Sequence, residues 1–123
     1  MKKLLLCLFV ITLLFITGCN KEEKTIEKKV MELDSYKDLV LDDIVSIETV
    51  KYTVGGDNRE TTSSKDDINR IYNMLNSTMI TDISEGTCED NTTVYILKTK
   101  DKSYTFEFEC NWFIYEGKHY NVK

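Results

Sequence analysis

The chain has 123 residues, of which 21 are acidic and 16 basic, so that its formal net charge is −5 at pH 7 with histidine neutral. A surface of this sign repels phosphate backbones and anionic headgroups, which argues against a nucleic-acid-binding protein and against membrane attachment through a polybasic patch. The length suits one small domain rather than two.

The first residues follow the order of an export signal. Two lysines precede an uncharged run from Leu4 to Ile16, which is too short to span a bilayer as a helix. The run ends in Ile16-Thr17-Gly18-Cys19, which resembles the lipobox of bacterial prolipoproteins. The resemblance implies that residues 1–18 are removed as a signal peptide and that Cys19 receives a diacylglycerol anchor.

Such an anchor implies a lipoprotein held at the extracytoplasmic face of the cell membrane, because two acyl chains bind far more durably than one. An ordinary cleaved signal and an uncleaved anchor are the alternatives. From Asn20 to Val40 the chain is rich in Lys, Glu and Asp, so we expect residues 19–40 to form a charged tether. Some apolar residues there sit near helical spacing, so part of the tether could form a short amphipathic helix. The folded domain would then span residues 41–123.

The domain begins with a predicted strand over Asp43–Val54, which is rich in β-branched residues and largely alternating. Its apolar positions change phase midway, which a bulge near Glu48 and Thr49 would explain. Residues 55–58, with the sequence GGDN, predict a reversal into a second strand through Thr61 and Thr62.

A helix is predicted next. Ser64 is expected to cap it, and Asp66 and Asp67 lie in the first turn, where the helix dipole favours acids. Apolar residues then follow at i, i+3, i+4 and i+7, namely Ile68, Ile71, Tyr72 and Leu75. This stripe should pack against a sheet.

The rest of the chain is typical of strands, at 79–83, 92–99 and 103–110, followed by a tight hairpin about Glu116-Gly117. In the third of these, Tyr104, Phe106, Phe108 and Cys110 should share one face. The expected fold is α+β, with one helix packed on a mostly antiparallel sheet of five or six strands. Its order of hairpin, helix and meander resembles the small uncharacterised lipoproteins of low-GC Gram-positive bacteria.

The four cysteines divide by position. Cys7 lies in the signal and Cys19 carries the lipid, which leaves Cys88 and Cys110 as the pair in the exported domain. Outside the cytoplasm a disulfide between them is the first expectation. Two separate thiols, or a redox or metal role, remain open. No metal site and no cofactor is predicted.

Aromatic residues crowd the last 30 positions, and strand alternation should turn some of them outward. Trp112, Tyr115 and Tyr120 are therefore the candidate binding residues of an exposed patch. The alternative is that these side chains complete a second small core or shield the sheet.

These features favour a non-enzymatic binding module outside the membrane, whose ligand is a protein, a peptide or a cell-wall component. An immunity or inhibitor lipoprotein that sequesters a peptide is a variant of this hypothesis. The competing class is a small thiol-dependent hydrolase or redox protein using Cys88, Cys110 or His119, although no known nucleophile signature surrounds these residues.

Overall fold

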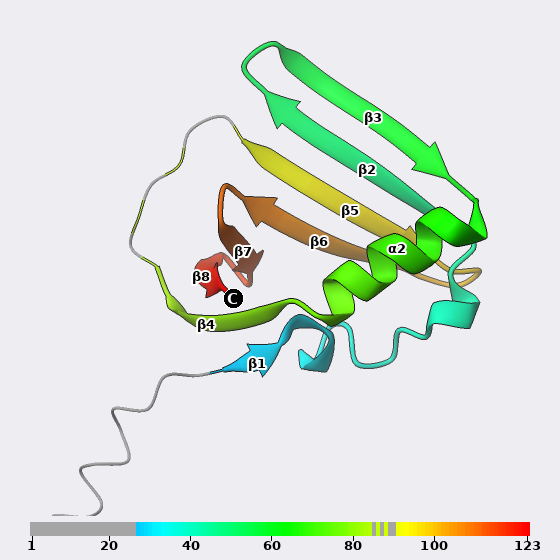
Figure 1. Ribbon diagram of the computed structural model, residues 1–123, viewed down its shortest axis with the longest axis horizontal. Helices are drawn as coiled ribbons and strands as arrows, with labels where there is room; N and C mark the ends of the chain where they lie inside the picture. The colour runs from blue at the N-terminus through cyan, green and yellow to red at the C-terminus, as the bar shows by residue number, and fades with distance from the viewer. Residues whose placement is uncertain (1–26, 85, 87, 89–90) are drawn as a thin grey trace, which may run out of the picture.

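The computed structural model describes residues 27–84, Gly86, Cys88 and residues 91–123. Within these residues, one α-helix packs on an eight-stranded sheet in which every pair of neighbouring strands is antiparallel (Figure 1). The predicted α+β class, with one helix on an antiparallel sheet, is confirmed. The sheet is larger than the five or six strands expected.

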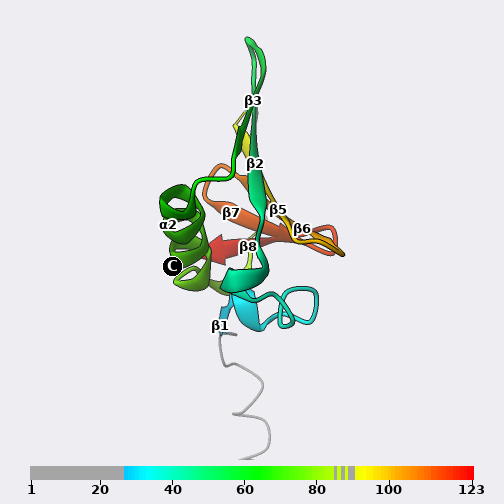
Figure 2. The same ribbon diagram turned by 90° about the vertical axis from the view of Figure 1, so that its right-hand side faces the viewer.

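The strands are β1 (Lys28–Lys29), β2 (Ser46–Thr53), β3 (Gly56–Thr62), β4 (Met79–Ile83), β5 (Thr92–Lys98), β6 (Ser103–Glu109), β7 (Trp112–Tyr115) and β8 (Lys118–Val122). The helix is α2 (Lys65–Asn76), and two 3-10 turns are η1 (Val30–Glu32) and η2 (Leu41–Asp43). The spatial order is β1-β4-β8-β7-β6-β5-β2-β3, so β1 and β3 form the two edges. Because α2 leads from the edge strand β3 to β4, which neighbours the other edge, it crosses the sheet, and Figure 2 shows it on one side of the sheet.

The helix forms where its apolar periodicity predicts. The stripe packs into the core as expected, with Ile68, Ile71 and Leu75 buried and Tyr72 partly buried against them. Ser64 occupies the N-cap position but makes no side-chain capping bond, contrary to expectation. Instead the Thr62 hydroxyl accepts the backbone N–H of Ser64 at 3.2 Å and donates to the Asp67 carboxylate at 3.0 Å.

Strand β2 contains no bulge. It pairs in continuous register with both β3 and β5 from end to end. Ile47 and Val50 lie three residues apart and therefore face opposite sides of the sheet. Ile47 joins the core, while Val50 is 1% exposed on the other side. The apparent change of phase thus reflects burial on both faces of one regular strand.

The turns at the C-terminal end are tight. The hairpin about Glu116-Gly117 is confirmed, with positive φ of 51° and 76° at the two turn residues, which suits right-handed strand twist. Cys110 does not continue the face of β6 as expected, because the strand ends at Glu109 and Cys110 lies in the turn with φ 52°. Its N–H donates to the Asn91 carbonyl at 2.9 Å, next to the start of β5.

The segment from 28 to 40 belongs to the folded domain, in place of the charged tether expected there. Val30, Leu33, Tyr36 and Leu39 are buried in the core. The Val30 N–H donates to the carbonyl of Thr78 at 3.0 Å, and β1 pairs with β4. Apolar side chains at every third position explain the burial, because a chain of short turns presents each of them to the sheet. Cys19 and the signal sequence lie outside the described residues.

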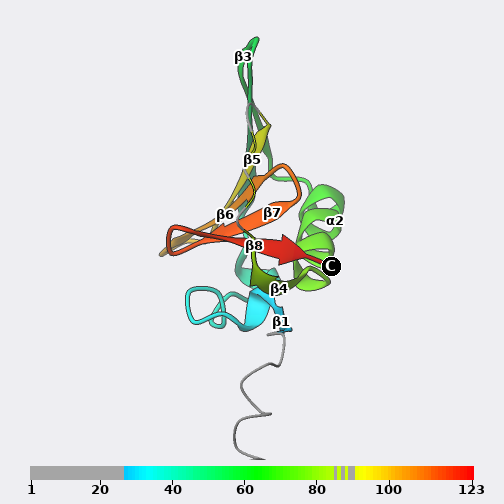
Figure 3. The same ribbon diagram turned by 90° about the vertical axis from the view of Figure 1, so that its left-hand side faces the viewer.

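The core is sandwiched between α2, the segment 30–44 and one face of the sheet. Its sheet residues are Ile47, Ile80, Leu97, Phe106 and Phe113. Figure 3 shows β1 and η1 at one end of the molecule and the turn between β2 and β3 at the other. The N-terminal edge of the sheet and the β2–β3 turn therefore lie far apart in the domain.

Candidate functional site

Strand register divides the sheet residues between two faces. We call the face under α2 the helix-side face and the other the open face. The apolar side chains of the open face are separate from the core cluster and comprise Val50, Val94, Ile96, Trp112 and Ile114. Polar side chains interleave with them on the same face, namely Glu48, Lys98, Glu107, Glu109, His119 and Asn121.

The three candidate binding aromatics do not form one patch. Tyr120 pairs with Phe113, and Tyr115 lies two residues beyond Phe113, so both tyrosines are on the helix-side face. Both pack against the core cluster. Trp112 lies on the open face instead. The two tyrosines thus pack on the main core and form neither an exposed patch nor a second small core.

A disulfide joins Cys88 to Cys110, as predicted, with the Cα atoms 6.2 Å apart. It ties the connection between β4 and β5 to the turn between β6 and β7. The backbone N–H of Ser84 also donates to the His119 carbonyl at 2.8 Å, so this connection is held at its β4 end as well as at Cys88. A sulfur that is bonded to another sulfur cannot act as a thiolate nucleophile.

Trp112 lies beneath this connection. A Cβ built on Gly86 would overlap the indole atoms Cζ2 and Cη2, so only glycine fits at this position. The Gly86 N–H donates to the Ser84 hydroxyl at 3.1 Å, and this bond helps to hold the Gly86 backbone against the indole. The open face is thus partly shielded at Trp112, and the disulfide lies in the same connection.

His119 and Glu109 meet across β7. The Nε2 atom of His119 lies 3.0 Å from Oε2 of Glu109, and both side chains are partly exposed. The Trp112 ring contacts the imidazole edge-to-face, with ring centroids 5.8 Å apart. The sequence did not indicate this cluster, because Glu109 and His119 sit on strands that are not neighbours.

A second polar group lies next to it. The carboxylate of Asp82 accepts hydrogen bonds from Asn121 at 3.1 Å and from Thr81 at 3.0 Å. The hydrogen bond from Asn121, and to a smaller extent that from Thr81, lowers the pKa of Asp82. Asp82 therefore stays ionised and fixes the end of β4 to β8.

At the other side of the open face, Glu48 binds two cations. Its carboxylate accepts Lys98 Nζ at 3.3 Å and Arg59 Nη1 at 2.9 Å, and its side chain is 18% exposed. The hydrogen bonds from Lys98 and Arg59 lower the pKa of Glu48. This bridge spans β3, β2 and β5 and lies beside the buried Val50.

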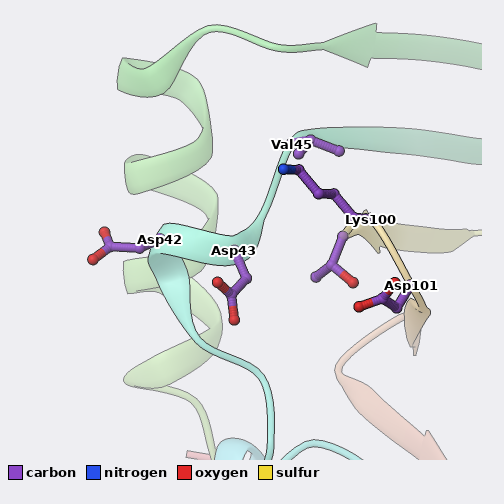
Figure 4. A pocket seen from close by; sticks show the side chains of 6 residues that line it. Asp42, Asp43, Val45, Lys100 and Asp101 are labelled. Carbon is purple, nitrogen blue, oxygen red and sulfur yellow. The ribbon is translucent and has the colours of Figure 1, made fainter.

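A shallow depression of about 290 Å³ lies between η2 and the turn that follows β5 (Figure 4). Asp42, Asp43 and Asp101 line it together with Lys100. Figure 4 shows the Asp42 carboxylate pointing away from the other two. Among the residues that the structure describes, no group of three or more His, Cys, Asp or Glu side chains is placed to hold a metal ion.

Comparisons with protein-family models, with curated proteins and with solved structures found no match to this chain. No helix in the described part of the chain has the length and apolar character needed to cross a bilayer.

Proposed function

We propose that this protein is a lipoprotein anchored through Cys19 at the extracytoplasmic face of the cell membrane, where it acts as a non-enzymatic binding module. The lipobox-like Ile16-Thr17-Gly18-Cys19 supports the anchor. The observation that carries the location is the disulfide between Cys88 and Cys110, because such bonds persist in oxidising compartments outside the cytoplasm.

The geometry favours binding over catalysis. The two cysteines of the domain are joined to each other, which leaves neither as a nucleophile while the bond is intact. The imidazole of His119 is engaged by Glu109 and by the ring of Trp112. These contacts suit a fixed surface that holds its shape before a partner arrives.

The proposed binding surface is the open face around Trp112 and Ile114. Trp112 and Ile114 offer apolar contact area there, and the carboxylates of Glu107 and Glu109, which lie directly opposite them on β6, offer hydrogen-bond acceptors to a protein or peptide. The partner is a protein, a peptide or a cell-wall component. A peptide partner would place the protein among immunity or inhibitor lipoproteins.

Fractionation tests the anchor. A Cys19→Ser chain loses the acceptor sulfur, so it should leave the membrane fraction, whereas the unmodified chain stays in it until detergent is added. A Cys7→Ser chain is the matched control, because Cys7 lies in the segment expected to be removed. Equal membrane retention of the Cys19 and Cys7 variants contradicts the anchor.

Photo-crosslinking tests the binding surface in intact cells. A photoreactive side chain at Ile114 on the open face should give a discrete adduct, whose mass separates peptide, protein and wall partners. The same group at Met74, which is exposed on α2, is the control. Adducts at Met74 that equal those at Ile114, or none at Ile114, would count against this surface.

A further inference from the structure

The two edges of the sheet differ in how they are protected. At one edge, β1 has two residues and β4 carries a register shift, and both features discourage pairing with another chain. At the other edge, β3 has seven residues in continuous register and no strand of the described chain on its outer side. Strand β3 therefore offers a long, regular row of backbone hydrogen-bonding groups.

The register of the hairpin fixes which groups point outward. Thr53 and Gly56 flank a two-residue turn and form the hydrogen-bonded pair that closes it. Hydrogen-bonded and non-hydrogen-bonded pairs then alternate along the hairpin. The N–H and C=O groups of Asp57, Arg59 and Thr61 consequently face away from β2.

We propose that β3 pairs antiparallel with β3 of a second copy of this chain, about a two-fold axis at Asn58. In this register Asp57 of each copy lies opposite Arg59 of the other, which gives two opposite-charge pairs on the open face. Moving the axis to Asp57, Arg59 or Glu60 places like charges directly opposite one another. Cross-strand charge pairs therefore select one register among the neighbouring ones.

Both charged side chains are available for this pairing. Asp57 is exposed, and the side chain of Arg59 is 57% exposed. Glu48 already holds one guanidinium nitrogen of Arg59 at 2.9 Å, which restrains the side chain while other N–H groups remain for a second carboxylate. Less side-chain freedom is then lost when the partner's Asp57 approaches.

This inference rests on the proposed anchor for its strength, because edge pairing through seven residues is weak for free copies in solution. Confinement to one membrane raises the effective concentration of the copies without any new contact. Strand β1, which follows the anchor, lies at the sheet edge opposite β3, and Figures 1 and 3 show the β2–β3 turn far from β1. The pairing edge is thus far from the strand at which the described chain begins.

Cysteine crosslinking tests the register. Across the proposed axis, the two Asn58 residues form a non-hydrogen-bonded pair with Cα atoms about 4.5 Å apart, within reach of a disulfide. The Asn58→Cys chain, lipidated and reconstituted in phosphatidylglycerol–phosphatidylethanolamine vesicles, should give a covalent dimer under mild oxidation. Glu60→Cys is the matched control on the same face of the same strand, because the two Glu60 residues would lie about 13 Å apart along the strands.

A charge variant supplies the second readout. Asp57→Lys in the Asn58→Cys background turns both attractive pairs repulsive and should lower the dimer yield about fivefold to tenfold. Equal crosslinking of the Asn58 and Glu60 variants, no crosslink at Asn58, or no effect of Asp57→Lys overturns the pairing. The lipid mass on Cys19 is measured on the same samples, so a lipidated chain without a dimer refutes the pairing alone. A native chain that carries no lipid on Cys19 refutes the anchor, and an Asn58 dimer that forms on such chains at high concentration still supports the pairing.

Discussion

The hydroxyl of Tyr36 donates a 2.6 Å hydrogen bond to the backbone carbonyl of Thr105, 69 residues further along the chain. The ring of Tyr36 stacks on Phe106 with centroids 4.0 Å apart, and the residue is 7% exposed. The segment around Tyr36, which the sequence predicts to be a solvated tether, is therefore fixed to the middle of the sheet. Any tether between a lipid on Cys19 and the domain is correspondingly shorter than the sequence indicates.

Replacement of Tyr36 tests this packing. Tyr36→Phe removes one hydrogen bond and should lower the free energy of unfolding by about 1 kcal/mol. Tyr36→Ala also removes the stacked ring and should cost about 3–5 kcal/mol. Urea titration measures both values. Tyr52→Ala is the control, since Tyr52 is 38% exposed, and a loss as large as that of Tyr36→Ala would refute the packing argument.

Alkaline pH should destabilise the fold through the same residue. Burial first, then the neighbouring Tyr115 and Glu107, raises the pKa of Tyr36 from 10.0 to about 12. Because the pKa is raised on folding, the neutral Tyr36 side chain makes its full contribution to the free energy of unfolding below pH 10. That contribution is lost as the pH rises through 12. The stability advantage of the wild type over Tyr36→Phe should be constant from pH 7 to 9 and shrink above 10. An advantage that does not change up to pH 11.5 would contradict this.

Acid should act through Glu48. Hydrogen bonds from Lys98 and Arg59 lower its pKa below the usual 4.5, so its contribution is present above that value and is lost as the pH falls through the folded-state pKa. Glu48→Gln should therefore be less stable than the wild type at pH 7, with the difference closing below pH 4. Thermal melts across this range give the difference. Asp101→Asn, in an exposed turn and without an ion pair in the described chain, should show no such convergence.

The disulfide should control both stability and the environment of the sole tryptophan. The bond closes a loop of 22 residues, so its reduction should lower the free energy of unfolding by roughly 3 kcal/mol. Because Gly86 covers Trp112 within the connection that carries Cys88, reduction should also shift Trp112 emission to the red in the folded protein.

A Cys88→Ser, Cys110→Ser chain should match the reduced protein and should not respond to reductant. Gly86→Val, with the disulfide intact, should give the same red shift, because the added side chain overlaps the indole. Unchanged emission in all three cases would mean that the connection does not shield the tryptophan.

Much of the fold could be predicted from periodicity. The stripe of Ile68, Ile71 and Leu75 defines the helix and its buried face, and the hairpin at Glu116-Gly117 follows from its turn residues. The prediction that residues 30–39 belong to a solvated tether was wrong, because it followed their many charges. The buried residues recur at every third position, namely Val30, Leu33, Tyr36 and Leu39.

The site was less predictable, for reasons of register. Tyr115 could have been assigned to the helix-side face, because it shares the phase of the buried Phe113 in β7, whereas Trp112 is out of phase with both. The contact of His119 with Glu109 could not have been predicted from the sequence. It spans the intervening strand β7, whose register depends on two separate turns.

The intact mass of the native protein, extracted from membranes without reductant, tests the central claim most directly. The account predicts a chain that begins at Cys19, carries the added mass of a diacylglycerol, and is lighter by two hydrogens for the Cys88–Cys110 bond. A chain that retains residues 1–18, has no lipid on Cys19 and contains Cys88 and Cys110 as free thiols would contradict it.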